Sequence, residues 1–288
     1  MAFIRKWRGS IFLYVVLAAY AVISLFPIVL VVMNSFKGRR DLFRVPYQPP
    51  VWFSFDEGLH VVNTFTLSGY GTVFARSRML WYYLNSLMIT SISLVLIIVL
   101  GLMLAYAMTE FVFRGRAALN VFVALGIMLP VTLGTSTIIR FVNWLGIYDT
   151  QWALILVYVA RGLPVCYVIM AEFLRSVSSE IKEAARIDGA NEFQILFGIV
   201  APLTRPAIAT VLAFQIIPVW NDLWFPLTLA PGERARTVTL GVSTFVGQYQ
   251  TDWTALLAAL SVAMIPLTIL FVIFSRQFVS GLTQGAVK

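Results

Sequence analysis

Six long runs of apolar residues constrain this chain more than any other feature of its sequence. Each run has at least 20 residues, enough for a helix to cross the hydrocarbon core of a bilayer, which is about 30 Å thick. Only 12% of the 288 residues are charged, about half the fraction in a soluble domain. The sequence therefore predicts an all-α membrane protein with a single transmembrane domain over residues 1–288. The predicted spans are residues 11–33, 84–108, 117–139, 152–171, 207–230 and 253–274.

The fifth run contains an acidic residue, Asp222, which follows Trp220 and Asn221 and precedes Trp224. An ionisable group inside a membrane is costly and is a functional-site candidate by default. A carboxylate, an amide and aromatic rings are also the groups with which a protein binds a sugar. These four residues form a candidate substrate path. The alternative is a structural hydrogen bond that joins this helix to a neighbour.

The fourth run contains Arg161, followed by Gly162 and Pro164. These residues predict a break in the helix, and a broken helix frees carbonyls that can line a cavity. The alternative, which the sequence favours, is a kinked helix in which Arg161 pairs with another helix or reaches the outer interface. Pro130 in the third run and Pro218 in the fifth predict further kinks.

The longest segment that is not apolar lies between the first two spans, at residues 34–83. Its three prolines and several aromatic residues predict an ordered cap rather than a linker. Basic residues are divided almost evenly between the two sides of the predicted topology, with a cluster that begins at Lys37. Charge therefore gives only a slight preference for a cytoplasmic N-terminus.

The sequence lacks the side chains for several kinds of chemistry. Cys166 is the only cysteine and His60 the only histidine, so we predict no disulfide, no metal site and no catalytic residues. No G-x-x-x-x-G-K-[ST] motif is present, so no cofactor, and no ATP, is expected to bind this chain. The net charge of +8 is scattered between the spans, which favours contact with lipid headgroups and not with nucleic acid.

A charged segment, residues 175–206, interrupts the apolar pattern before the fifth span. Ser179, or alternatively Ser178, can cap a helix there, and Gly189 is suited to the left-handed position that ends it. Asn191 and Gln194 have the spacing of a capping box at the start of a second helix. The segment therefore predicts two short helices.

The first of these helices is expected to present a face of small residues to another protein. Glu183 and Asp188 beside that face could bond to a basic partner, and Arg186 lies on its flank. The alternative is a solvent-exposed loop between two spans that binds no partner. The predicted face consists of Ile181, Ala184, Ala185 and Asp188.

The spacing within this segment resembles the EAA motif of ABC importer permeases. Glu183, Ala184 and Ala185 are followed by Gly189 and then by Ile199 and Pro202, while Ala201 stands where that family usually has Leu. Further stretches resemble the carbohydrate permeases of the maltose-transporter type, the MalG-like branch. They are LGIYDTQWALIL (Leu145–Leu156), VWNDLWFPL (Val219–Leu227) and FVSGLTQGAVK (Phe278–Lys288).

The resemblance implies a type I ABC-importer (MetI-like) permease fold of six transmembrane helices with both termini cytoplasmic. Residues 34–83 would be extracytoplasmic, and residues 175–206 would be a cytoplasmic loop that couples the permease to an ATPase. The implied coupling residues are Glu183, Ala184, Ala185, Arg186, Asp188 and Gly189.

The resemblance also implies that the C-terminal tail reaches into the ATPase dimer through Gly281, Leu282, Thr283 and Gly285. The composition of the last eight residues, GLTQGAVK, argues otherwise, because two glycines and a single charged residue do not favour a stable isolated helix. From composition, the alternative is a frayed end.

The resemblance implies a permease subunit and not an enzyme. It would import a carbohydrate (an oligosaccharide or glycoside) across the bacterial cytoplasmic, or inner, membrane by alternating access. Expected partners are a second permease subunit in a heterodimer, two ATP-binding cassette subunits that bind ATP and Mg, an extracytoplasmic sugar-binding protein, and membrane lipid. The alternatives are an ABC permease for a non-sugar solute, an ion-coupled secondary transporter, and an intramembrane hydrolase. A secondary transporter would be expected to show intramembrane acids and internal repeats, whereas the sequence has one such acid and no convincing repeat. A hydrolase would need a Ser/His pair, and no histidine lies in any predicted span.

Overall fold

The structure is a computed structural model that describes residues 2–51, 54–55, 61–76, 78–128, 130–247 and 249–284. Within these ranges the regular structure is helical except for one antiparallel pair of strands, β1 (Ser54–Phe55) and β2 (Val61–Val62). The chain forms two compact units, Met1–Leu80 with Gly241–Ile265 and Trp81–Leu240 with Pro266–Lys288. Each unit is described on its own.

Four helices are long and apolar enough to cross a membrane. Two further pairs of helices pass the same test together but are bent at a short break, so the described residues contain four to six candidate spans. The four long helices are α1 (Ala2–Asn34), α4 (Met79–Glu110), α7 (Gln151–Arg175) and α14 (Trp253–Gln284).

The predicted third span, residues 117–139, is not one straight helix. It is divided into α5 (Arg116–Met128), η1 (Val131–Gly134) and α6 (Thr135–Trp144), with a bend of 90° between its two halves. Pro130 lies at the break with an extended backbone. Since proline has no N–H to donate to the preceding turn, the helix cannot continue through this position without losing a hydrogen bond.

The predicted fifth span, residues 207–230, is divided as well. It contains α11 (Arg205–Trp220) and α12 (Trp224–Leu229), while Pro218 is accommodated inside α11. Before α11, three consecutive helical turns meet α11 at an angle of 76°. These turns are α9 (Glu192–Ile195), η2 (Leu196–Val200) and α10 (Ala201–Leu203), and the separate helix α8 (Ser179–Ile187) precedes them.

In the first unit, the described residues that follow α1 form an ordered cap, as the prolines and aromatics of this segment predicted. Lys37 is fully buried there, and its ammonium donates to the Asn34 side chain at 2.9 Å and to the Val45 carbonyl at 2.8 Å. The ring of Phe36 stacks on that of Phe65, with centroids 5.5 Å apart. Burial lowers the pKa of Lys37. The remaining helices here are α2 (Arg39–Arg44) and α3 (Ser68–Arg76).

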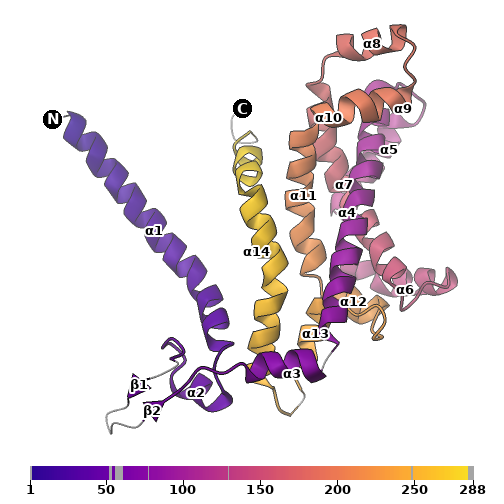
Figure 1. Ribbon diagram of the computed structural model, residues 1–288. Helices are drawn as coiled ribbons and strands as arrows, with labels where there is room; N and C mark the ends of the chain where they lie inside the picture. Colours follow the sequence, from indigo (N-terminus) through magenta and orange to yellow (C-terminus); the bar gives the residue numbers. More distant parts are fainter. Residues whose placement is uncertain are drawn as a thin grey trace. The chain divides into compact units, whose positions relative to one another are not determined.

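In the second unit, α7 is the central helix and packs against α5, α11 and α12. Figure 1 shows α4, α7 and α11 side by side, with α8 to α10 at one end and α6 and α12 at the other. Helix α4 approaches α7 closely because Gly101 faces the side chain of Cys166, and a Cβ at that glycine would overlap the sulfur. Small residues permit such packing between membrane helices. The short α13 (Val238–Ser243) is bonded to α4 through Ser86.

Helix α14 extends to Gln284, ten residues beyond the predicted end of the sixth span at residue 274. The composition of the tail predicted no stable helix in isolation, yet its described residues, 275–284, are helical here because they continue a long helix. Adding a residue to an existing helix avoids the cost of nucleation, which explains the difference.

Candidate functional site

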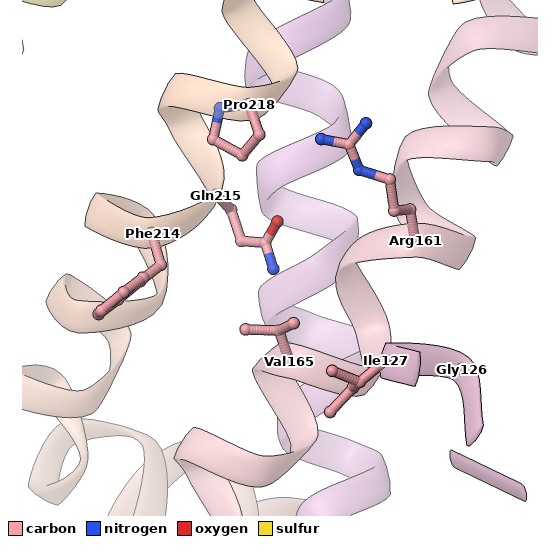
Figure 2. A pocket seen from close by; sticks show the side chains of 7 residues that line it. All are labelled: Gly126, Ile127, Arg161, Val165, Phe214, Gln215 and Pro218. Carbon is pink, nitrogen blue, oxygen red and sulfur yellow. The ribbon is translucent and has the colours of Figure 1, made fainter. Parts of the chain in front are cut away.

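A cavity of about 360 Å³ lies within the second unit, between α5, α7 and α11. Figure 2 shows Arg161 of α7 and Gln215 of α11 on opposite sides of it. Helix α7 is continuous through Gly162 and Pro164, so the predicted break in the fourth span is absent. None of the four residues of the predicted substrate path is among the residues that line this cavity.

The predicted substrate-path residues form structural contacts at the break between α11 and α12. Asp222 accepts hydrogen bonds from the Tyr158 hydroxyl at 2.9 Å and from the backbone N–H groups of Trp224 and Phe225 at 3.2 and 3.3 Å. The carboxylate thereby satisfies the first N–H groups of α12 and ties that helix to α7. These bonds match the structural alternative that the sequence left open for Asp222.

The two tryptophans of this group also contact neighbouring helices. Trp220 is buried, and its ring meets that of Tyr83 edge-on with centroids 5.8 Å apart. The indole N–H of Trp224 donates to Thr135 of α6 at 2.9 Å. Asn221 is exposed.

The charged segment folds as its capping residues predicted. Ser178, the alternative cap, accepts a bond from the Glu180 N–H at 3.2 Å, so α8 begins at Ser179. At its end Gly189 has a φ of +86°. The N–H groups of Gly189 and Ala190 donate to the carbonyls of Arg186 and Ala185 at 3.1 and 3.0 Å, which is a Schellman cap.

The second predicted helix, α9, begins with the predicted capping box. The Gln194 N–H donates to the Asn191 side chain at 2.9 Å, and the Asn191 N–H donates to the Gln194 side chain at 2.8 Å. Two N–H groups that a helix leaves free at its start are therefore satisfied.

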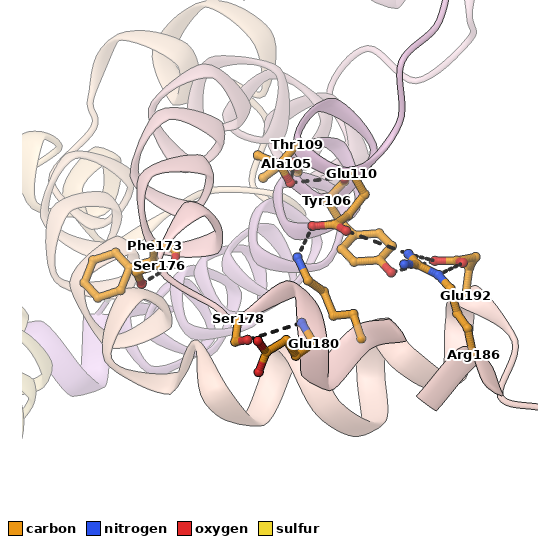
Figure 3. Close-up of polar contacts among 11 residues, drawn as sticks. Ala105, Tyr106, Thr109, Glu110, Phe173, Ser176, Ser178, Glu180, Arg186 and Glu192 are labelled. Carbon is orange, nitrogen blue, oxygen red and sulfur yellow. Dashed lines mark hydrogen bonds and ion pairs between the residues drawn. The ribbon is translucent and has the colours of Figure 1, made fainter. Parts of the chain in front are cut away.

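A network of charged side chains fastens α8 and α9 to the end of α4. Lys182 forms an ion pair and hydrogen bond with Glu110, which also lies 3.7 Å from Arg186. The Nε of Arg186 donates to Glu192 at 2.8 Å, and the Tyr106 hydroxyl donates to the same carboxylate at 2.6 Å. Figure 3 shows Tyr106 and Glu110 facing Arg186 and Glu192. These five residues are called the α4–α8 network below.

The network shifts the pKa values of Arg186 and Glu192, which form its outer pair. The hydrogen bond from Arg186 lowers the pKa of Glu192, and the bond from Tyr106 lowers it further. The same bond to Glu192 raises the pKa of Arg186. Both groups therefore stay charged around neutral pH, so the outer pair remains intact there.

The expected small-residue face of α8 is divided between two sides of the helix. Ala185 is buried and shares its side with Lys182, whereas Ala184 and Glu183 are exposed. The exposed side also carries Ile187, whose side chain is 86% exposed. An exposed isoleucine on a charged helix favours a partner that covers it.

The remaining predicted coupling residues lie at the end of α8 or in the tail. Asp188 and Gly189 are exposed at the C-terminal end of α8. Gly281, Leu282 and Thr283 belong to the last turns of α14. Gly285 lies outside the described residues.

The sequence did not indicate that Glu110, Lys182, Tyr106 and Glu192 would meet. A signal was present, since Glu110 is the acidic residue that ends an apolar run and Tyr106 precedes it by one turn. Among the residues that the structure describes, no group of three or more His, Cys, Asp or Glu is arranged to hold a metal ion.

The fold of this chain is shared by a solved structure. A solved structure of a bacterial ABC transporter involved in the import of the acidic polysaccharide alginate matches 93% of this chain and 95% of its own, with a TM-score of 0.74 and 22% identity. This match shows the fold alone, which is the MetI-like fold of ABC importer permeases.

Sequence comparison places the chain in a family. A model of the binding-protein-dependent transport system inner membrane component matches residues 97–284. The chain belongs to this family and is therefore a transport subunit rather than an enzyme. The predicted family resemblance is confirmed.

Three similar proteins cover nearly all of the chain. A probable ABC transporter permease protein, YurM of Bacillus subtilis, is 30% identical over 99% of this chain and 91% of its own length. The diacetylchitobiose uptake system permease protein NgcG of Streptomyces coelicolor is 28% identical over 96% and 88%. The arabinooligosaccharides transport system permease protein AraQ of Halalkalibacterium halodurans is 28% identical over 94% and 94%.

Proposed function

We propose that this chain is the permease subunit of an ATP-driven, solute-binding-protein-dependent importer that moves a carbohydrate across the bacterial cytoplasmic membrane. The observation that carries the proposal is the near-complete match to permeases named for diacetylchitobiose and arabinooligosaccharide transport. The solute is an oligosaccharide or glycoside, and it crosses by alternating access.

The proposed assembly pairs this chain with a second permease subunit, two ATP-binding cassette subunits and an extracytoplasmic sugar-binding protein. ATP and Mg are bound by the cassette subunits. In this arrangement the chain has six spans, each bent pair of helices counting as one. Both termini are cytoplasmic, and the cap after α1 is extracytoplasmic.

Helix α8 is the proposed docking element for the ATPase. Its exposed side offers Glu183, Ala184 and Ile187, while its other side is held to α4 by the buried Lys182–Glu110 pair. Because a rigid attachment transmits displacement, movement of α8 by the ATPase would move α4 as well. A loop held only by its two ends would absorb that displacement instead.

The C-terminal end of α14 is a second proposed contact with the ATPase, through Gly281, Leu282, Thr283 and Gly285. Its support is the resemblance together with the helix that continues to Gln284. The substrate path through Trp220, Asn221, Asp222 and Trp224 has less support, because the contacts of Asp222, Trp220 and Trp224 hold helices together.

The docking proposal is tested by ATP hydrolysis in the complete, lipid-reconstituted transporter. Ile187→Asp should abolish the stimulation of hydrolysis by sugar-loaded binding protein, because it places a charge in the proposed interface. Val112→Asp is the matched control, since Val112 is 91% exposed in the loop between α4 and α5, outside α8 and outside the candidate spans. Full stimulation in the Ile187 variant would contradict docking through this side of α8.

A further inference from the structure

The cavity between α5, α7 and α11 is lined by a positively charged residue, Arg161, near the middle of a candidate membrane span. Arg161 lies near the middle of α7, a helix of 25 residues that is apolar enough to span a membrane. Its guanidinium lies beside the cavity in Figure 2. A charged side chain at the centre of a bilayer costs several kcal/mol unless it is paired or faces a polar cavity.

Arg161 has no ion pair or hydrogen bond from its side chain within the part of the chain that the structure describes. No ion pair joins it to Asp222, the acid predicted in a span, within the described residues. The oxygens of that carboxylate accept bonds from Tyr158, Trp224 and Phe225. The positive charge at the cavity is therefore available to a ligand.

The opposite wall of the cavity supplies hydrogen-bond acceptors. Gln215 is buried, and its amide nitrogen donates to the Gly162 carbonyl at 3.2 Å. That bond fixes the amide so that its oxygen remains as an acceptor. Pro218 also lines the cavity and, lacking an N–H, leaves the Phe214 carbonyl without its helical donor.

Apolar side chains complete the lining. Val165, Ile127 and Phe214 surround the polar groups, and Phe214 is half-exposed at the side of the cavity. A few polar groups set in an apolar lining are typical of sites for small ligands, whose volumes begin at about 300 Å³. The 360 Å³ of this cavity is large enough for such a site.

We propose that this cavity is a membrane-embedded site for the transported carbohydrate and that this carbohydrate is acidic. Arg161 binds its anionic group, a carboxylate or sulfate, because a guanidinium forms paired hydrogen bonds with such groups. Gln215 accepts a bond from a hydroxyl of the same sugar. The inference rests on the proposed function and specifies the chemical class of its solute.

The test uses the complete transporter with its binding protein in proteoliposomes. Two labelled panels are compared for ATP-driven uptake: oligosaccharides that contain a uronic acid or a sulfate, and the same oligosaccharides after carboxyl reduction or desulfation. The variants are Arg161→Gln and Arg161→Lys. The control is Arg140→Gln, because Arg140 is exposed on α6 and does not line the cavity.

The proposal expects uptake of an acidic member and weak uptake of its neutral counterpart. Arg161→Gln should lower uptake of the acidic sugar by about tenfold or more through a higher KM, while the complex still assembles. Uptake of the acidic sugar by Arg161→Lys should lie between that of the parent and that of Arg161→Gln, because lysine keeps the charge but not the paired bonds. Arg140→Gln should transport like the parent.

Three results would overturn the inference. Uptake restricted to neutral sugars would remove the acidic solute while leaving the proposed function in place. If Arg161→Gln prevents assembly of the complex and lowers uptake of every solute equally, the arginine pairs with the second permease subunit instead. Uptake of no carbohydrate from either panel would overturn the proposed function as well.

Discussion

Removing the charge of Glu110 should release α8 from α4. In Glu110→Gln the buried ammonium of Lys182, whose side chain is 6% exposed, loses its anionic partner. Loss of one partner of a buried pair costs about 3–5 kcal/mol. Glutamine keeps an acceptor oxygen, and Arg186 keeps its bond to Glu192. We therefore expect a cost below that range, about 2 kcal/mol, which changes the equilibrium between α8 attached to α4 and α8 released from it by a factor of about 30.

Hydrogen exchange of the protein in lipid nanodiscs measures this change directly. The amides of residues 182–188 should exchange about 30-fold faster in Glu110→Gln, since exchange of these amides requires α8 to open. Glu172→Gln is the matched control. Its pair with Arg175 has side chains that are 60% and 68% exposed, and such exposed pairs contribute about 0–1 kcal/mol.

A double substitution separates the ion pair from other effects of the change. In Glu110→Gln with Lys182→Met no buried charge remains unpaired, so protection of α8 should largely return. The reasoning is refuted if Glu110→Gln exchanges like the Glu172 control, or if the effects of the two substitutions simply add.

Three other outcomes follow from the same structure. The pKa of Glu192 is lowered by Arg186 and Tyr106, so its contribution to α8–α9 stability is complete above the unfolded value of about 4.3. That contribution should be lost as the pH falls through the lower folded value; Glu192→Gln should remove this pH dependence of exchange in the segment. Gly189→Ala should destabilise the end of α8 by about 1–2 kcal/mol, because φ is +86° there; equal exchange in variant and parent would exclude strain at this turn. In a Cys166→Ala background, Tyr47→Cys and Tyr249→Cys, 74% and 92% exposed, should react with an impermeant thiol reagent outside the membrane, and Ile187→Cys only after lysis. The reverse pattern would invert the topology.

Local features of the charged loop were predictable because they depend on neighbours in sequence. The capping box at Asn191 and Gln194 and the left-handed Gly189 involve atoms within a few residues of one another. Even here, the choice between Ser178 and Ser179 as the cap required the structure.

The contacts that hold the loop were not predictable in the same way. Lys182 and Glu110 are 72 residues apart, and Tyr106 and Glu192 are 86 apart, so their meeting depends on how α4 packs beside the loop. The same packing decides which of Ala184 and Ala185 is buried, because helical spacing alone treats both sides of α8 alike.

The bends in the third and fifth runs show a related limit. Pro130 and Pro218 both predicted kinks, but only the run that contains Pro130 turns by 90° at its proline. Helix α11 continues past Pro218, and the chain breaks instead at Asn221, where Asp222 satisfies the next helix start. The composition of a run does not say which proline is compensated by nearby hydrogen bonds.

Uptake of a labelled oligosaccharide by the reconstituted complex tests the central claim most directly. This measurement follows uptake with ATP, with a non-hydrolysable analogue, and with a protonophore, each in the presence and absence of the binding protein. The account predicts uptake that requires both ATP hydrolysis and the binding protein and that persists when ion gradients are collapsed. Uptake that is abolished by the protonophore and proceeds without ATP would contradict it.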